Sequence, residues 1–310
     1  MMNKPELYIA AGSVEEARRY VEAGADAVSV GEHRFGMRLP GEINLDGLSE
    51  LIPWCHERGA KVYVVANNIM DNESIPLLPA YLQRVQELQA DALVFGDPAV
   101  LIAVRQAAPG LPLHWNAEMT STNYVTASYW GSKGANRVVL ARELNMDETL
   151  EIKANLPSMQ VQVQVHGITN IYHSKRSLVT NYEDHQGRGD DRGKGLDNGL
   201  FLIEQERQDE RFPLYEDENG THIMSSDDIC MLENLHELIE GQIDSLKIEG
   251  LLKSVEYNEA AVSSYRQVID AYCEDPEQYQ FQEQWLDAIR ELQDPRRELS
   301  FGFFYKEQVY

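Results

Sequence analysis

The feature that most constrains the fold is a repeated pattern of a short β-rich run, a turn and a helical segment. ELYIAAG (6–12) ends at a glycine, and SVEEARRYVEAG (13–24) follows it. Ser13 is placed to cap a helix there, and Gly24 is placed to end it. Similar runs recur roughly 20 to 35 residues apart, and helices between successive strands are typical of right-handed crossovers in a parallel sheet.

Eight strands are predicted from this pattern, at 6–12, 26–31, 61–68, 91–97, 112–118, 136–143, 160–167 and 244–250. An α/β chain of eight parallel strands, each with its helix, predicts a (β/α)8 barrel of the TIM type, and 310 residues suit one such domain. We expect the barrel to span 1–272, with a long insertion at about 168–228 before the last strand. The remaining segment, 273–310, should form a helical and aromatic tail packed on the barrel.

Charge and cysteine content limit the possible binding partners and the cellular compartment of the protein. The chain carries 51 Asp and Glu against 27 Lys and Arg, a net charge of -24. Such a surface disfavours unaided nucleic-acid binding and indicates either a solvated exterior or a basic partner protein. The three cysteines, Cys55, Cys230 and Cys273, form no CxxC pair, which favours a reduced compartment. No run reaches the roughly 18 apolar residues of a membrane span, and no signal peptide is apparent, so we predict a cytoplasmic protein without membrane contact.

Polar residues end nearly every predicted strand, and barrel enzymes work at the carboxyl ends of their strands. If the chain has chemistry, His166 would transfer a proton, Arg142 would fix an anion, and Lys247 with Glu249 would orient them. The latter two are two residues apart and so share one side of a strand, although a buried structural pair fits equally well. The remaining mouth residues are predicted to bind substrate: Arg38, Asn67, Asp97, Asn116, Glu118 and Glu143.

Familiar catalytic patterns are missing from the sequence. It has neither a GxSxG motif nor an HExxH motif, which leaves serine-esterase and zinc-protease chemistry unsupported. His166, His173 and His185 match no common zinc spacing, so no metal site is predicted. The cysteines fall in helical or apolar patterns and are interpreted as packing residues, and GRGDDRGKG (187–195) is interpreted as a flexible loop.

Several ordered motifs nevertheless resemble one family. They are AGADAVSVG with FGMR (23–38), NRVVLAREL (136–144), VQVHG (163–167), SLVTNY (177–182), YEDENGTHIMSSDDICML (215–232) and DSLKIEG (244–250). Over roughly residues 6–272 the chain resembles the peptidase U32 family, also called collagenase-like proteases. The family label implies a peptidase. Other members resemble hydroxylation proteins that act on tRNA wobble uridine, ribosomal RNA or ubiquinone, with prephenate as the hydroxyl source and a 4Fe-4S cluster on four cysteines.

This sequence departs from the family at the expected cluster ligands. Asn170 stands where the first cysteine is expected and Ser177 where the second is, and 187–199 lacks the second cysteine pair. A cluster of this kind needs about four thiolates, so no cluster is expected in this chain. The departure resembles short, cysteine-lacking members that occur in Gram-positive bacteria beside a longer cysteine-bearing paralogue, and this resemblance implies that the chain is the first subunit of such a pair.

Three functions stay open at this point. The resemblance implies a cluster-free subunit of a prephenate-dependent tRNA hydroxylation (5-hydroxyuridine) system, with the paralogue as partner and tRNA contacted indirectly. The second is a peptidase. The third is a non-catalytic structural partner or small-anion-binding protein, in which Arg38, Arg142, Lys247 and His166 neutralise a carboxylate such as prephenate. Whether the chain is itself an enzyme, and whether it forms homo- or hetero-oligomers, is left open by the sequence.

Overall fold

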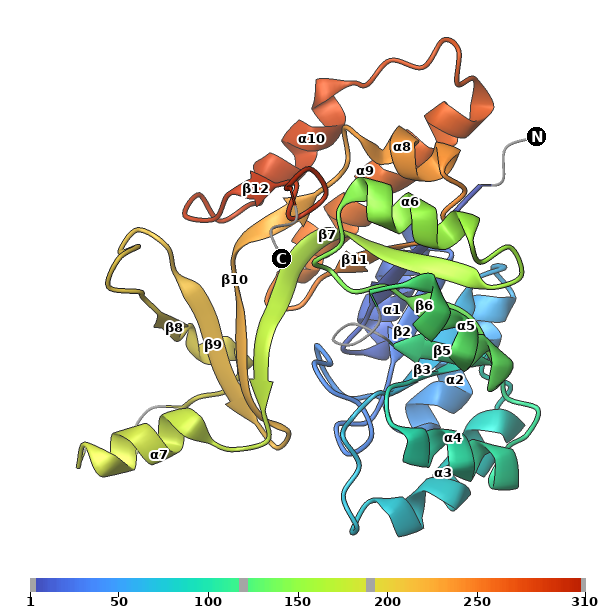
Figure 1. The fold of residues 1–310 in the computed structure, drawn as a ribbon, viewed down its shortest axis with the longest axis vertical. Helices are drawn as coiled ribbons and strands as arrows, with labels where there is room; N and C mark the ends of the chain where they lie inside the picture. The colour runs from blue at the N-terminus through green and yellow to red at the C-terminus, as the bar shows by residue number, and fades with distance from the viewer. Residues whose placement is uncertain (1–3, 117–121, 188–192, 308–310) are drawn as a thin grey trace.

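A computed structural model describes residues 4–116, 122–187 and 193–307, and Figure 1 shows the chain as a barrel with a projecting arm. Among these residues eight parallel strands close the barrel, because β11 pairs with both β1 and β7. The predicted (β/α)8 fold is confirmed. The barrel strands are β1 (Glu6–Ala10), β2 (Ala27–Val30), β3 (Lys61–Ala66), β4 (Ala92–Phe95), β5 (Leu113–Asn116), β6 (Ala135–Val139), β7 (Gln160–Ser174) and β11 (Ser245–Glu249).

The helices follow their strands and cover the barrel. Ser13 caps α1 by accepting a hydrogen bond from the Glu16 amide at 3.1 Å, and Gly24 follows the helix with φ +114, as predicted. Asn145 begins α6 with a capping box. The described helices of this layer are α1 (Val14–Glu22), α2 (Leu45–His56), η1 (Ile75–Leu77), α3 (Leu78–Glu87), α4 (Pro98–Ala107), α5 (Tyr124–Ser132), α6 (Met146–Ala154), α8 (Leu235–Glu240) and α9 (Val255–Glu274).

The two faces of the barrel strands differ in chemistry. Outward-facing residues such as Leu7, Val28 and Ile248 are fully buried in one large apolar core against the helices. The inward face is polar by comparison, with a ring contact of 4.6 Å between Tyr63 and His114. This alternation explains why the strands appear as short, only partly apolar runs in the sequence.

A buried ion pair fills the amino-terminal end of the barrel. Arg137 is 2% exposed, and its guanidinium donates to the two carboxylate oxygens of Glu6 at 2.5 and 3.2 Å. Tyr63 donates to the same carboxylate at 2.6 Å, and Ser245 donates to it at 3.0 Å. Burial alone would raise the pKa of Glu6, but the charge and hydrogen bonds of Arg137, with Tyr63, outweigh it and lower the pKa to about 2. The pair therefore ties β1, β3, β6 and β11 together.

The insertion forms an arm, defined here as Ile168 to Asp228. The predicted strand 160–167 does not end at Gly167, because β7 continues to Ser174 and pairs antiparallel with β10 (Gly220–Cys230). The arm also holds α7 (Leu178–His185), η2 (Leu196–Asn198), β8 (Phe201–Leu202) and β9 (Phe212–Asp217). Figure 1 shows it as a hairpin that stands away from the barrel.

The tail lies against the base of the arm. Its helix α10 (Glu283–Arg290) packs on α9, and its short strand β12 (Leu299–Ser300) pairs in parallel with β10 at Asp228 and Ile229. None of the helices in the described ranges is long and apolar enough to cross a membrane.

The buried ion pair generates a stability prediction. Glu6→Gln leaves the Arg137 charge buried without its carboxylate, and we expect the free energy of unfolding to fall by about 3–5 kcal/mol in urea titrations at pH 7. Lys61→Gln is the matched control, because the Lys61 amine lies 3.3 Å from the same carboxylate but is half exposed. It should cost less than about 1 kcal/mol. In the native chain the contribution of Glu6 is complete above pH 4.5 and is lost as the pH falls toward 2. Equal costs for the two variants would contradict this assignment.

Candidate functional site

The carboxyl ends of the barrel strands enclose two adjoining cavities of about 240 and 30 Å³, here called the mouth pocket. Met37, Arg38, Asn67 and Asn116 line both cavities. The structure thus brings together six of the residues predicted from strand ends: Arg38, Asn67, Asp97, Asn116, Lys247 and Glu249.

The charged pair of β11 lies in the wall of this pocket. Lys247 and Glu249 form an ion pair with 2.9 Å between Nζ and Oε2, and both side chains are largely buried. They share one side of the strand, as their spacing of two predicts. An amine and a carboxylate held side by side at a cavity can bind a polar substrate or exchange a proton with it.

Other pocket residues are held by the backbone around them. Asn67 accepts a hydrogen bond from the Met37 amide at 2.8 Å, which fixes the loop that carries Arg38. Arg38 itself has φ +54, a left-handed conformation that is uncommon for arginine and marks a constrained loop. Asp97 caps α4 through the Ala99 amide at 2.8 Å and accepts from the Met70 amide at 3.0 Å. The pocket is therefore preorganised by local hydrogen bonds.

The arm covers one side of the mouth through Asn219, a residue that strand-end reasoning missed. Its amide nitrogen donates to the carbonyls of His33 at 3.1 Å and Gly36 at 3.3 Å, and its oxygen accepts from Asn68 at 2.5 Å. Asn219 lies in the tight turn between β9 and β10, and the Asn-Gly dipeptide is the sequence signal that could have located this turn.

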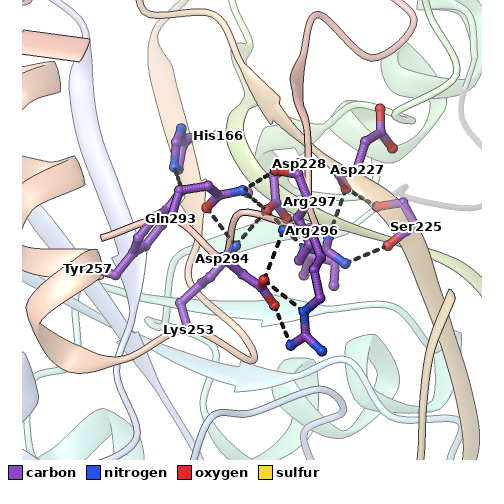
Figure 2. A network of polar contacts seen from close by, with 12 residues as sticks. His166, Ser225, Asp227, Asp228, Lys253, Tyr257, Gln293, Asp294, Arg296 and Arg297 are labelled. Carbon is purple, nitrogen blue, oxygen red and sulfur yellow. Dashed lines mark hydrogen bonds and ion pairs between the residues drawn. The ribbon is translucent and has the colours of Figure 1, made fainter. Parts of the chain in front are cut away.

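The prediction that His166 lies at the mouth is wrong. A bulge in β7 pairs Lys247 with Gln164 but Ile248 with His166, so one extra residue turns the imidazole to the outer face. There it is fully buried, 2.9 Å from the Tyr257 hydroxyl of α9 (Figure 2). Burial lowers the pKa of His166 to about 4, so the ring is neutral at pH 7. Its role here is packing and hydrogen bonding.

Three further predicted residues lie away from the mouth pocket or outside the described chain. Arg142 is directed toward the arm and donates to the carbonyl of Asn170 at 3.2 Å. Glu143 is exposed beside it, and neither residue lines the cavities. Glu118 lies outside the described residues. Arg142 therefore contacts the arm and does not line the mouth pocket, and its anion-fixing role stays a prediction.

One arrangement resembles a cysteine–histidine pair and bears on the peptidase alternative. The Tyr265 hydroxyl lies 3.9 Å from the Cys230 sulfur and 3.4 Å from His166 Nδ1. Burial raises the pKa of Cys230 and lowers that of His166, whereas a nucleophilic pair needs a thiolate beside an imidazolium. All three side chains are buried behind the barrel wall, out of reach of a peptide.

Comparison with known proteins places this geometry in a family. The signature of peptidase family U32 matches residues 12–309. The chain belongs to peptidase family U32. It is 46% identical to "tRNA hydroxylation protein P2" of Bacillus subtilis (strain 168) over 311 residues, which cover 100% of both chains. It is also 31% identical to "tRNA hydroxylation protein P1" of that strain, over 99% of this chain and 74% of the relative.

These relatives refine the resemblance seen in the sequence. The B. subtilis relative that matches this U32 chain over the full length of both is designated P2, whereas the resemblance seen in the motifs implied the first subunit of a pair. Among solved structures, that of the U32 peptidase Mk0906 superposes with a TM-score of 0.50 at 16% identity, covering 80% of this chain and 94% of that one. This likeness supports the fold alone.

The residues that stand in place of the family's expected cluster ligands lie in the arm of this U32 chain. Asn170 is buried within β7, and its side-chain oxygen makes no hydrogen bond to any described residue. Ser177 is exposed just before α7, beyond an extended segment from Asn170 to Ser174 of about 13 Å at 3.3 Å per residue.

The available thiols are not arranged as a cage either. They lie in α2 (Cys55), at the end of β10 (Cys230) and in α9 (Cys273). Within the described ranges no group of three or more His, Cys, Asp or Glu side chains could hold a metal ion. The residues at the family's positions therefore do not fit a cluster that four thiolates would hold.

Burial of His166 predicts a pH effect on stability. Its pKa is about 4 when folded and about 6.5 when unfolded, so the unfolded state binds more protons between these values. The contribution of His166 to the free energy of unfolding should fall by about 3 kcal/mol as the pH drops from 6.5 to 4, and His166→Asn should reduce the pH dependence measured in urea titrations by about that amount. His185→Asn, at an exposed histidine of α7, should retain it. A slope unchanged in His166→Asn would refute the assignment.

Proposed function

We propose that this chain is a cluster-free subunit of a cytoplasmic tRNA hydroxylation system that forms 5-hydroxyuridine at the wobble position. The observation that carries the proposal is the 46% identity to the B. subtilis tRNA hydroxylation protein P2 over the full length of both chains. Asn170 and Ser177 at the family's ligand positions support a division of labour, in which a longer, cysteine-bearing U32 paralogue supplies the iron–sulfur cluster.

Within this proposal the mouth pocket binds the small-molecule substrate, a carboxylate such as prephenate. Arg38 and Lys247 are its cationic side chains, and a carboxylate such as that of prephenate is the group they would hold. The Lys247–Glu249 pair would orient the ligand, since both groups are largely buried and fixed to β11. The low-dielectric wall strengthens such contacts relative to the same groups in water.

The arm is the proposed contact for the paralogue. Helix α7 has no buried residue and exposes Leu178 and Tyr182, and the outer part of β7 exposes Ile171 and Tyr172. Exposed apolar side chains on a projecting element are typical of a protein interface. With a net charge of -24 on this chain, the RNA contact would fall to the partner, so tRNA is reached indirectly.

Deleting the gene should abolish 5-hydroxyuridine and its derivatives in nucleoside mass spectrometry of total tRNA, and the native gene should restore them. Complementation with Lys247→Met should leave the modified fraction at least about tenfold lower, because the mouth pocket loses its amine. Lys61→Met is the matched control, since Lys61 is an exposed strand lysine at the opposite end of the barrel. Unchanged tRNA nucleosides after deletion would exclude the function.

Partner binding is tested separately, by affinity measurement with the purified cysteine-bearing paralogue. Leu178→Asp with Tyr182→Asp should weaken the complex at least about tenfold, because charges enter an apolar contact. Val125→Asp, at an exposed apolar residue of α5, should bind like the native chain. Iron and sulfide should accompany the complex. Equal affinities for the arm variant and the control would place the interface elsewhere.

A further inference from the structure

A second cavity, of about 240 Å³, lies outside the barrel mouth, where the arm, the loop after β11 and the tail meet. Here it is called the arm–tail pocket. Its walls come from η2, β8 and β9 of the arm, from the segment that follows β11, and from the tail loop before β12. The residues that carry the argument are Arg211, Leu214, Leu252, Lys253, Arg296 and Arg297.

One wall is built on a buried carboxylate that two cations share (Figure 2). Asp228 is fully buried and accepts from Lys253 at 2.5 Å, from Arg297 at 2.7 and 3.0 Å, and from Gln293 at 2.8 Å. Arg297 also donates to the carbonyls of Asp227 at 2.9 Å and Ser225 at 3.2 Å. Two cations against one carboxylate leave this rigid group with one net positive charge.

The rim adds further positive charge. Arg296 is two-thirds exposed and pairs with Asp294, with 2.9 Å between Nη2 and Oδ2, so that pair is neutral. Arg211 of the arm also lines the cavity and stacks on the Phe201 ring at 4.7 Å from its centroid, and no ion pair joins it to any residue in the described ranges. The pocket and its supporting carboxylate carry four cations and two anions, a surplus of two in a chain of net charge -24.

The opposite wall is apolar. Ile168, Leu196, Leu200, Phe201 and Leu214 face the cavity from the arm. Leu252 adds to the apolar lining from a backbone with φ +63, a strained conformation for a leucine. A concave apolar surface with a few fixed polar groups is the usual form of a small-molecule site.

We propose that the arm–tail pocket binds a small organic acid, a compact apolar skeleton that carries a carboxylate or phosphate group. The skeleton lies against Leu214 and Leu252, and the acidic group meets Arg211 and Arg296 at the rim, with Lys253 and Arg297 held behind it. This site is separate from the mouth pocket, and the proposal does not depend on a role in tRNA hydroxylation. Because arm and tail both form the walls, a bound acid would also fix the arm against the tail.

Calorimetric titration of the full chain with benzoate, phenyl phosphate and the neutral benzamide tests the site. We expect an acidic probe to bind with Kd on the order of 1 mM and benzamide at least about tenfold more weakly. The better-bound acid identifies carboxylate or phosphate as the preferred group. If neither acid binds, or if benzamide binds equally well, the proposal is overturned.

Variants locate the binding. Arg211→Gln with Arg296→Gln should weaken the acid at least about tenfold, and Arg290→Gln, an exposed α10 arginine outside the pocket, should not. The Lys-for-Arg double variant, Arg211→Lys with Arg296→Lys, should regain part of the affinity because it keeps the charge. Binding that is lost in Lys247→Met but kept in the Gln double variant would place the acid at the mouth and overturn the proposal.

Methyl NMR gives a readout that does not depend on any variant. Benzoate or phenyl phosphate should shift the resonances of Ile168, Leu214 and Leu252 in the native chain. Shifts confined to Met37 and Val65, which line the mouth pocket, would contradict the assignment.

Discussion

The architecture depends on the point where β7 leaves the barrel. Gly167 has φ +93, and a Cβ atom there would lie 1.9 Å from the carbonyl oxygen of Glu249. Only glycine allows β7 to cross the end of β11 this closely while the strand turns outward into the arm. The bulge just before it turns His166 away from the barrel interior. The His-Gly motif is therefore the point where the strand changes from barrel to arm, and the arm–tail pocket depends on this departure because arm residues such as Leu214 form its wall.

The barrel itself could be predicted from the sequence because its signals are local. Strand runs, helix caps such as Ser13 and terminating glycines such as Gly24 each depend on a few neighbouring residues, and the structure has them at the predicted places. Because the carboxyl ends of barrel strands meet at one mouth, it could also be predicted that Asn67, Asn116 and Lys247 line one cavity, and they do.

The sequence predictions that failed depended on contacts between distant residues, which leave no local pattern in the sequence. The alternation of Gln162 and Gln164 extrapolates to an inward His166, and a single-residue bulge is invisible in that pattern. The arm strand beyond Gly167 contains polar residues such as Asn170 and His173 and looks like a loop, yet its ladder with β10 makes it a strand. The pairing of Arg297 with Asp228 joins residues 69 positions apart, so neither the charge cluster nor its pocket could be inferred from the sequence.

The same ladder explains how an arm can lack thiolates and still keep its shape. Between His166 and Ser174 the backbone of β7 is paired with β10, and Arg142 ties the Asn170 carbonyl to the barrel. The acidic surface repels anions only over a short distance, because at physiological salt its electrostatic field decays over about 8 Å. Small acids can therefore reach Arg211 and Arg296 once they are inside the pocket, whereas a polyanion such as RNA must lie along the repelling surface. This difference in size and reach supports the proposed division of labour, in which this chain binds small anions and its partner contacts the nucleic acid.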